Sequence, residues 1–516
     1  MTTQIAAEAF DEIPASERTS GTHVEVQGVP GYLRESQECC IIAQMVTTGD
    51  LAGTATPGVP VELAGDGSAA AALFGRGSHA HRLVKAFKAC NKTMPLTVVP
   101  LADNPAGTAA SLTITIAGPA TGAGTINLYV GLDRVQVGVA AADTAAQLAT
   151  ALIAAVNAAT DLPVVAAAIE GQAAQVKLTA KHKGEIGNAI KVQMNLLGSL
   201  GGEALPAGIT VTGTGFLTGG VSNPSQTAAR AAVAGRTYHY FYLGGWSDTA
   251  TLDAWSAEFN DMWSPVRDLW GRIGFSARRG SLSALKSFGQ ARATDRFISV
   301  VGVYDSPAPE WESGARFFGR VTRSLANHPA RPLHTLGLIG DRAGPPEMEF
   351  TKADRSNLLW SGISTIEPDP ASGLMIDRAI TLYQKNAAGD PDDTWLDVTT
   401  PATVGRIVNE IKKLVFDRFI ATRCVLVDDD TPIGPGIPYA TPKLIKATII
   451  AHYDQLMRLG LAENIEAFKA LFQVGRDPGN ATRVNMIYTP DIANPLVTFA
   501  AQVKFSLQWP ADLAGS

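Results

Sequence analysis

The chain has 516 residues, 46% of them hydrophobic, and a formal net charge of −6 at pH 7. A chain of this length predicts roughly three or four domains with packed cores. The acidic balance gives no general attraction to nucleic acid, whose binding proteins usually carry an excess of basic residues. These bulk properties therefore predict a multidomain protein that does not contact nucleic acid directly.

Cysteine content and apolar runs bear on the compartment in which the chain folds. Four cysteines without a C-x-x-C pair cannot form a disulfide framework in so long a chain, so we expect reduced, buried thiols. The first residues show no basic region followed by an apolar run, which predicts no secretory signal. No apolar stretch approaches the roughly 18 residues needed to span a bilayer, so we expect no membrane insertion and folding in a reducing cytoplasm.

Residues 1–22 are polar and rich in turn-forming residues, with scattered apolar side chains at Ile5, Phe10 and Ile13. That spacing fits neither a clean helix nor a long strand. We interpret this stretch as an extended N-terminal arm that lies on another surface. Plain disorder is the alternative that the sequence leaves open.

Residues 23–103 have an ordinary globular composition and form the first part of the predicted core. Apolar runs at 40–43 and 96–101 predict buried strands, and residues 69–90 predict a helix interrupted by Gly75-Arg-Gly-Ser. A strand, a helix and a strand at this spacing predict a parallel α/β layer. The glycine pair without a following lysine is a weak phosphate-loop signal, so we favour a helix-breaking turn.

Residues 104–223 differ in composition from the rest. Their aromatic residues are Tyr129 and Phe216, whereas all eight tryptophans lie at Trp246 or later. Alternating runs predict strands at 112–116, 125–130, 134–139, 162–165 and 175–179, and residues 144–159 predict an alanine-rich helix with one apolar face. We interpret this block as a small α+β domain inserted into the larger one, since insertions enter at surface loops.

The α/β pattern resumes over residues 224–400, the second part of the predicted core, and residues 401–516 form a C-terminal domain. We expect strands at 238–243, 297–303 and 333–339, a helix at 252–263, a long amphipathic helix at the end of 397–421 and a helical region over 442–470. The final predicted strand, 497–507, has one apolar face made by Val497, Phe499, Ala501, Val503, Phe505 and Leu507. A strand with one apolar face needs a sheet to join, either its own or that of a neighbouring copy.

Six segments together carry a resemblance to a known family. They are 72–79 (ALFGRGSH), 301–307 (VGVYDSP), 336–346 (LGLIGDRAGPP), 357–365 (NLLWSGIST), 377–389 (DRAITLYQKNAAG) and 392–400 (DDTWLDVTT). In their order and spacing the chain resembles the contractile phage tail sheath proteins, most closely the Mu-like branch. The resemblance runs from about residue 20 to the end and is weakest over 104–223.

The resemblance implies a structural function. Sheath subunits of this family form hexameric rings stacked in a helix around a tail tube, with terminal arms that add strands to neighbouring subunits. A signal from the baseplate shortens the sheath, which drives the tube through the host envelope and delivers the genome. The implied partners are further copies of the chain, the tail tube, the baseplate and the tail terminator. The implied location is the virion tail, assembled in the host bacterial cytoplasm.

The residues proposed to exchange strands between subunits are Ile5, Phe10, Ile13, Val497, Phe499, Val503, Phe505 and Leu507. An alternative that keeps the same contractile mechanism is the sheath of a phage-tail-like bacteriocin or of a related injection system. The genes that lie beside the gene for this chain would distinguish a phage from such a particle, because a phage also encodes a capsid and a terminase.

A serine hydrolase is the alternative from another class, because the resemblance also implies a subtilisin-like composite core. A catalytic triad needs a serine within hydrogen-bond reach of a histidine that an acid orients. The candidates are Ser78 near His79 and His81, Ser276, and Asp341 near His334, and none lies in a G-x-S-x-G motif. We therefore expect no catalysis, and a serine-reactive probe would distinguish the two classes.

Other patterns have a simpler structural explanation. His79 and His81 could bind a metal, but no further Cys/His cluster accompanies them, and we favour an exposed polar pair. The run Asp428-Asp-Asp-Thr-Pro is favoured as a solvated turn over a calcium site. Core packing is favoured for Trp246, Trp255, Trp263 and Trp270, with burial against a partner as the alternative. We expect no cofactor and no metal.

Overall fold

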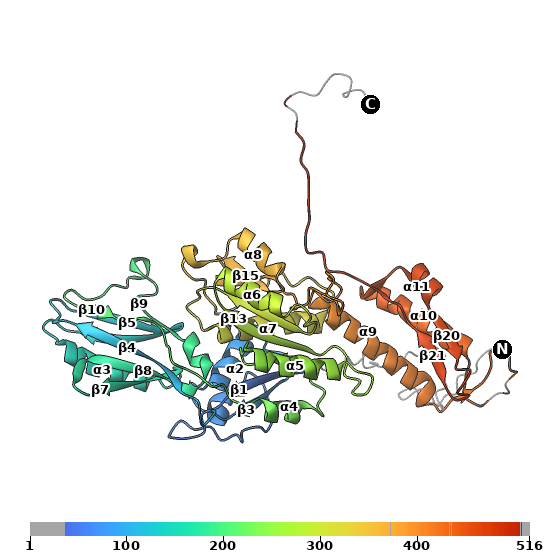
Figure 1. The fold of residues 1–516 in the computed structure, drawn as a ribbon, viewed down its shortest axis with the longest axis horizontal. Coiled ribbons are helices and arrows are strands. Elements are labelled where there is room, and N and C mark those ends of the chain that lie inside the picture. Colours follow the sequence, from blue (N-terminus) through green and yellow to red (C-terminus); the bar gives the residue numbers. More distant parts are fainter. Residues whose placement is uncertain (1–36, 372, 433, 435, 506, 508–516) are drawn as a thin grey trace, which may run out of the picture. The chain divides into compact units, whose positions relative to one another are not determined.

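The computed structural model describes residues 37–371, 373–432, 434, 436–505 and 507. A six-stranded sheet is its central element (Figure 1), with the spatial order β14-β13-β12-β1-β3-β2. The strands are β1(Cys39–Gln44), β2(Val61–Leu63), β3(Leu96–Leu101), β12(Tyr240–Tyr242), β13(Ile273–Arg279) and β14(Ile298–Val303). All neighbouring pairs are parallel except β2 with β3. The mixed α/β class predicted from the sequence is therefore present.

The first strand–helix–strand unit is confirmed. β1 and β3 are parallel, and α1(Ala70–Phe74) and α2(His79–Cys90) lie between them in the chain. The glycines of the interrupting turn, Gly75 and Gly77, have φ of 90° and 69°, a region that glycine tolerates and other residues avoid. Ser78 then begins α2 by accepting the backbone N–H of His81 at 3.1 Å, as an N-cap residue does.

The parallel strands follow a doubly wound order. Taken along the chain as first to fifth, β1, β3, β12, β13 and β14 lie in the spatial order 2-1-3-4-5. The direction of winding reverses between the neighbours β1 and β12. In open α/β sheets, the crevice at the carboxyl ends of the strands beside such a reversal is where ligands bind.

Helices cover both faces of this sheet. On β13, Gly274 leaves no room for a side chain, because a Cβ there would lie 2.4 Å from the ring of Phe259 on α5(Thr249–Met262). The next residue, Phe275, packs its ring against Phe318 of α7(Glu310–Asn327), with centroids 5.3 Å apart. Successive residues of a strand face opposite sides, so α5 and α7 lie on opposite faces.

Two four-stranded antiparallel sheets are built within residues 104–223, here called the inserted segment. Their orders are β10-β4-β8-β7 and β11-β9-β5-β6. The strands are β4(Ala109–Ala117), β5(Gly124–Val130), β6(Asp133–Val139), β7(Val164–Ile169), β8(Gln172–Lys183), β9(Lys191–Met194), β10(Thr210–Thr212) and β11(Gly215–Phe216). Helix α3(Ala145–Ala158) packs on β6, β7 and β8 and begins with a capping box between Thr144 and Gln147. Strands and a helix are thus found where the alternating and alanine-rich patterns predicted them.

Residues 399–492, here called the C-terminal lobe, enclose a second apolar cluster. The elements are α9(Thr399–Val415), η5(Phe416–Ile420), β17(Val425–Leu426), β18(Tyr439–Ala440), α10(Pro442–Arg458), β19(Ala462–Glu463), α11(Ile465–Leu471), β20(Gln473–Arg476), β21(Val484–Ile487) and β22(Asp491–Ile492). In its centre Tyr453 stacks on Phe468 with ring centroids 3.9 Å apart. Helix α9 joins the two clusters, because Ala402 belongs to the main core and Ile407 and Ile411 to the second.

The strand predicted at 333–339 is wrong. Backbone hydrogen bonds do tie the segment to β16(Gly373–Arg378), from Thr335 N–H to the Ile376 carbonyl at 2.8 Å and from Leu338 N–H to the Leu374 carbonyl at 2.7 Å. However, Thr335 has a φ of 63°, which interrupts the extended backbone that a regular strand requires. Only the bridge between Gly337 and Met375 forms in the described part of the segment.

The remaining elements complete the described chain. They are α4(Thr227–Val233), α6(Leu282–Ala291), α8(Lys352–Leu359) and β15(Thr365–Asp369), with the short helices η2(Glu185–Ala189), η3(Ser199–Gly201) and η4(Pro346–Met348). Among the described residues, no helix is long and apolar enough to cross a bilayer.

Candidate functional site

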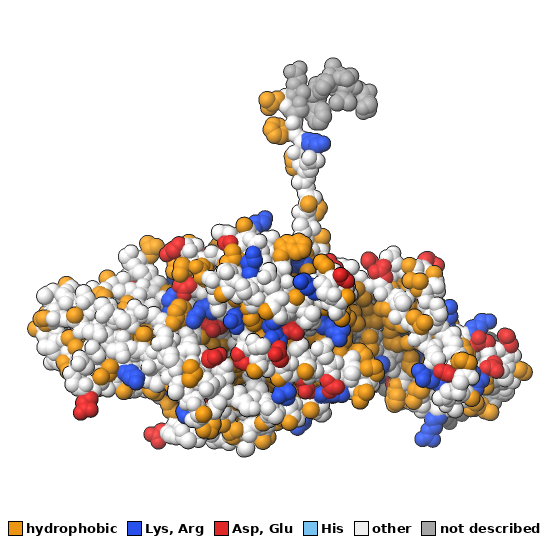
Figure 2. All heavy atoms as spheres, viewed as in Figure 1, with side chains coloured by type: hydrophobic (Ala, Val, Ile, Leu, Met, Phe, Trp, Pro, Cys, Tyr) orange, Lys and Arg blue, Asp and Glu red, His pale blue; other side chains and the backbone are white. Residues whose placement is uncertain are grey.

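The terminal segment, residues 497–507, is exposed at all of its described positions except half-buried Val497. Phe499, Val503, Phe505 and Leu507 have exposed fractions of 84%, 85%, 85% and 99%. Figure 1 draws the described residues of this segment as an extended chain without strand pairing, and Figure 2 shows apolar side chains along it. Within the described part of the chain, this segment therefore does not pair with a sheet of its own subunit. Pairing with a neighbouring copy stays a prediction.

The beginning of this segment lies against the core. Pro495 and half-buried Val497 line a shallow pocket together with His334, Arg378 and Asp397. Arg378 forms a two-pronged ion pair with Asp397, at 3.1 and 3.0 Å. Val497 is thus the one residue of the proposed exchange set that contacts the core, whereas Ile5, Phe10 and Ile13 lie outside the described residues.

The C-terminal lobe carries a strand with an open edge. Within the described residues β21 pairs only with β20, in antiparallel register from Gln473 opposite Ile487 to Arg476 opposite Val484. Met486 and Ile487 on β21 are 39% and 58% exposed. An unpaired edge beside exposed apolar side chains is the kind of surface that accepts an added strand.

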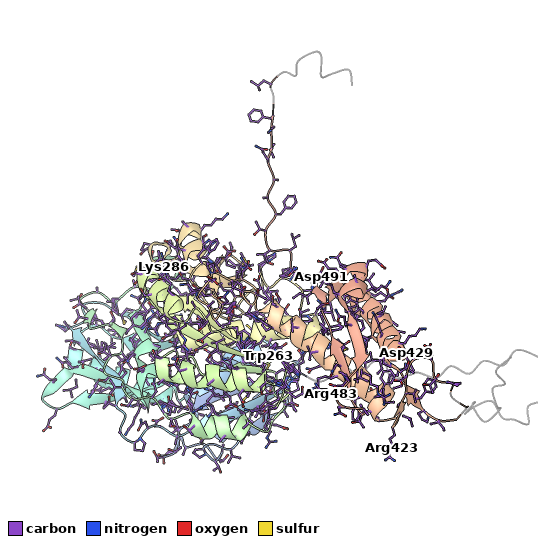
Figure 3. The ribbon with its side chains drawn as sticks, turned by 45° about the vertical axis from the view of Figure 1, so that its right-hand side comes forward. Trp263, Lys286, Arg423, Asp429, Arg483 and Asp491 are labelled. Carbon is purple, nitrogen blue, oxygen red and sulfur yellow. The ribbon has the colours of Figure 1, made fainter. Side chains whose placement is uncertain are left out.

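Charged side chains lie on the turns of the same lobe (Figure 3), where Arg423, Asp429 and Arg483 are labelled. Asp429 accepts the backbone N–H of Lys443 at 2.7 Å. Its neighbour Asp428 pairs with Arg476 at 2.9 Å. The acidic run is therefore a turn whose carboxylates hold α10 and β20, consistent with the predicted solvated turn.

The candidate serines and Asp341 are engaged in structural contacts. Ser78 caps α2, as described above. Ser276 donates to the Trp246 carbonyl at 2.7 Å, and Asp341 accepts the backbone N–H of Arg342 at 2.9 Å. In the described part of the chain, none of the candidate serines hydrogen-bonds a histidine ring. The geometry thus supplies no activated serine among these residues.

The prediction of an exposed histidine pair is wrong. His79 is 2% exposed, and burial lowers the pKa of its ring well below the usual value, which keeps the ring neutral. His81 is half-buried, and its Nδ1 accepts the backbone N–H of Gly77 at 3.1 Å. The physical reason is that the first turn of α2 points into the crevice at the sheet's carboxyl edge rather than to solvent.

A hydrogen-bond network joins the inserted segment to the core at this crevice. Asp103 accepts from Gln44 Nε2 at 2.7 Å, from the Lys183 backbone N–H at 2.9 Å and from His182 Nδ1 at 2.8 Å. The Nε2 of His182 accepts the backbone N–H of His79 at 3.0 Å, so the ring proton is on Nδ1. Burial would raise the pKa of Asp103, but the hydrogen bonds from His182, Lys183 and Gln44 hold it below its usual value.

Two buried tryptophans lie against the His79 ring at this edge of the sheet. The His79 ring makes edge contacts with Trp246 and Trp311, at centroid distances of 5.3 and 5.0 Å. Trp311 also donates from Nε1 to the Ile186 carbonyl of the inserted segment at 3.1 Å. The place where an open α/β sheet receives a ligand is therefore filled by side chains of the core and of the inserted segment.

Sequence reasoning missed this network. Asp103 and His182 are 79 residues apart and belong to no local motif. The available signal was the position of Asp103 two residues after the end of a buried strand, at the edge where functional side chains gather. Nothing near His182 identified its partner.

The tryptophans and cysteines behave largely as predicted. Trp246, Trp255 and Trp263 are buried, while Trp270 is half-buried and donates to Asp268 at 2.5 Å. Cys39, Cys40 and Cys90 are buried free thiols, and burial raises the pKa of Cys39 to about 12. Cys424 is only partly buried.

Comparison with known proteins identifies the class. Residues 219–382 match the model of the phage tail sheath protein central domain, and residues 105–210 match that of the phage tail sheath protein beta-sandwich domain. The chain is 33% identical over 507 residues to the Mu-like prophage FluMu tail sheath protein of Haemophilus influenzae, covering 97% of this chain and 99% of that protein. The molecule is thus a structural component of a phage tail.

Its family follows from the same matches: the chain belongs to the phage tail sheath proteins. Two solved sheath tail proteins are also similar. That of Desulfitobacterium hafniense has 13% identity and a TM-score of 0.45, over 92% of this chain and 100% of the other. That of Listeria innocua has 11% identity and a TM-score of 0.47, over 90% and 93%.

Proposed function

We propose that the chain polymerises by strand exchange into a sheath of stacked hexameric rings around a tail tube, and that contraction of this sheath drives the tube through the host envelope to deliver the genome. The observation that carries the proposal is the exposed apolar face of the terminal segment. Phe499, Val503 and Phe505 each leave about 85% of their area in water. Burying one such side chain contributes about 1.5–3 kcal/mol, so a neighbouring sheet offers a gain that the single subunit lacks.

We further propose the edge of β21 as the acceptor. Strand addition supplies main-chain hydrogen bonds, and alternate side chains supply specificity. Met486 and Ile487 lie on opposite faces of β21 and are both exposed, so each face offers an apolar side chain beside which the apolar face of the terminal segment would pack. The N-terminal residues Ile5, Phe10 and Ile13 are proposed as a second donor, which would link each subunit to more than one neighbour.

Contraction requires subunits that stay linked while larger contacts change. A head-to-tail contact that does not close generates an open helical array. Donated strands keep neighbours at high effective concentration when other interfaces break and re-form. Two packings of one subunit then exchange according to their difference in free energy. The terminal segment suits this linking role because its exposed residues are held to the core at Pro495 and Val497.

The proposed organisation follows the sequence prediction. Residues 1–22 are an arm, 23–103 and 224–400 form a subtilisin-like core, 104–223 are an inserted domain, and 401–516 form a C-terminal domain with the second arm. The mostly parallel sheet with helices on both faces supports such a core. The proposed partners are the tail tube, the baseplate and the tail terminator, with assembly in the bacterial cytoplasm.

Two matched variants test the strand-exchange step. Phe499→Lys with Phe505→Lys charges the apolar face, whereas Thr498→Lys with Gln502→Lys places the same charges on the opposite face. All four residues are exposed, so both variants should unfold at the wild-type temperature. Negative-stain electron microscopy and sedimentation are then compared in the presence and absence of tail tube.

We expect wild type and the polar-face variant to form tubes or stacked rings, and the apolar-face variant to remain as single subunits. Deletion of residues 497–516 should have the same effect as the apolar-face variant. Equal polymerisation of both lysine variants, or a wild-type chain that stays monomeric even on tail tube, would contradict the proposal.

A further inference from the structure

One sheet of the inserted segment has an edge strand, β7, whose composition is unusual for that position. β7 is the last strand in the order β10-β4-β8-β7 and pairs with β8 alone among the described residues. Its sequence, VVAAAI, contains no charge and no proline, and Val165 is 42% exposed. Natural proteins usually protect such edges with charges, bulges or proline, because an open apolar edge pairs with strands of other chains.

Here the protection comes from a side chain. Asn157, in the last turn of α3, donates from Nδ2 to the Ala166 carbonyl at 2.8 Å and accepts the Ala166 backbone N–H on Oδ1 at 2.9 Å. A strand residue whose N–H and C=O both bond to one partner is paired as in an antiparallel ladder. The carboxamide of Asn157 therefore occupies the place that a residue of an added strand would take, at the middle of β7.

The edges of the other sheets can be compared with that of β7. The free side of β14 is covered by the chain itself, since Gly302 N–H bonds the Ser364 carbonyl at 3.0 Å and Ser364 N–H bonds the Val300 carbonyl at 2.9 Å. β2 has only three residues and carries Glu62. β21, by contrast, has no cover of this kind among the described residues. The edge of β14 is thus occupied and that of β2 is short and charged. β6, the edge strand of the second sheet of the inserted segment, pairs only with β5 among the described residues and carries Asp133 and Arg134.

We propose that Asn157 closes the edge of β7 against strand addition by a second copy of the chain, so that copies associate elsewhere. Without it, β7 of two copies could pair antiparallel with Ala166 at the centre, because neither strand carries a charge that would oppose the contact. The inference goes beyond the proposed function: it concerns a contact that the chain avoids rather than one that it makes.

A purely structural role for Asn157, tying α3 to β7, is the competing explanation. It predicts that any association of an Asn157 variant comes from partial unfolding. A variant that protects the edge of β7 again without restoring the two hydrogen bonds of Asn157 distinguishes the two explanations. Ala167 is exposed on β7, so a lysine there places a charge at the edge while leaving the Ala166 groups unpaired.

The test compares wild type, Asn157→Ala, Ala167→Lys and the double variant by sedimentation velocity at one concentration, without tail tube. Asn157 is exposed and contributes no core atom, so Asn157→Ala should fold with a modestly lower unfolding temperature. We expect Asn157→Ala to form several-fold more of a larger species than wild type. The double variant should lose this species while keeping the lowered unfolding temperature, and Ala167→Lys alone should match wild type.

Two results would overturn the inference. Asn157→Ala could sediment as wild type does, or its larger species could persist in the double variant, which would assign the association to unfolding. The comparison is with wild type under the same conditions, so it does not depend on whether wild type polymerises. Failure of strand exchange would appear instead in the lysine variants of the terminal segment.

Discussion

A Cβ atom on Gly405 would lie 2.2 Å from the Cα of Gly271, so α9 crosses the loop before β13 at direct backbone contact. Gly271 has a φ of 81°, which a residue with a side chain adopts only with strain. Seven residues further along α9, Lys412 forms an ion pair with Asp268 of the same loop. This crossing fixes α9 on the core, and through α9 the C-terminal lobe.

Replacing Gly405 by alanine should therefore displace α9 and cost about 1–3 kcal/mol of unfolding free energy, as over-packing usually does. Urea denaturation measures the change. Gly235→Ala is the matched control, since a Cβ at Gly235 meets no atom within 4 Å. Equal stabilities for the two variants would show that the crossing tolerates a side chain.

The ion pair between Lys191 and Asp305 should hold the inserted segment to the core. Lys191 Nζ lies 2.7 and 2.8 Å from the two carboxylate oxygens, and both side chains are 14% exposed. Removing one partner leaves a poorly solvated charge, so Lys191→Met and Asp305→Asn should each cost about 2 kcal/mol.

A double-mutant cycle isolates the pair itself, with an expected coupling of about 1 kcal/mol from chemical denaturation. The exposed pair of Lys469 and Glu466 is the control, for which we expect no more than about 0.5 kcal/mol. A coupling at Lys191 as small as in the control pair would mean that other contacts hold the segment.

His239 should make the protein sensitive to acid. Burial, and then the charges of Arg272 and Arg406, lower the pKa of its ring to about 3. In the unfolded chain the ring titrates near 6.5, so below that pH the unfolded state binds a proton that the folded state does not. Stability is then lost as the pH falls from about 6.5 toward 3, by at most about 1.4 kcal/mol per pH unit.

The measurement is the unfolding free energy of wild type and His239→Gln between pH 7 and 4. Glutamine cannot titrate, so the variant should lose less stability over this range, whatever its stability at pH 7. Parallel pH profiles for the two proteins would rule out His239 as the source of the acid sensitivity.

Tyr453 should tie α10 to the end of the C-terminal lobe. Its hydroxyl donates to the Glu463 carbonyl at 2.6 Å and accepts the backbone N–H of Asp491 at 3.1 Å, and Asp491 is labelled in Figure 3. Tyr453→Phe keeps the stack on Phe468 but removes both bonds, at a cost of about 1–2 kcal/mol.

Hydrogen exchange at the Asp491 amide should become faster in Tyr453→Phe than in wild type. Tyr439→Phe, at a tyrosine that is 43% exposed, is the control and should leave this amide unchanged. Unaltered exchange in both variants would show that the hydroxyl does not protect this end of the lobe.

Local patterns predicted the elements whose stability is local. The short apolar runs that became β1 and β3 indicated buried strands, and the alanine-rich stretch that became α3 carried a helical periodicity with one apolar face. The error at 333–339 arose because an apolar run does not reveal a left-handed residue such as Thr335. The network of Asp103 and His182 could not be predicted, because it depends on how the inserted segment returns to the core.

The occupied crevice between β1 and β12 has a consequence for how this fold is used. In open α/β proteins that position exchanges small molecules with the solvent, and each molecule switches between an empty and a filled state. Here the groups at this position are side chains of the protein itself, so the position cannot alternate between an empty and a filled state. Every copy of the chain holds the same side chains there. The copies of the chain are therefore alike at this position, whatever small molecules the surroundings supply.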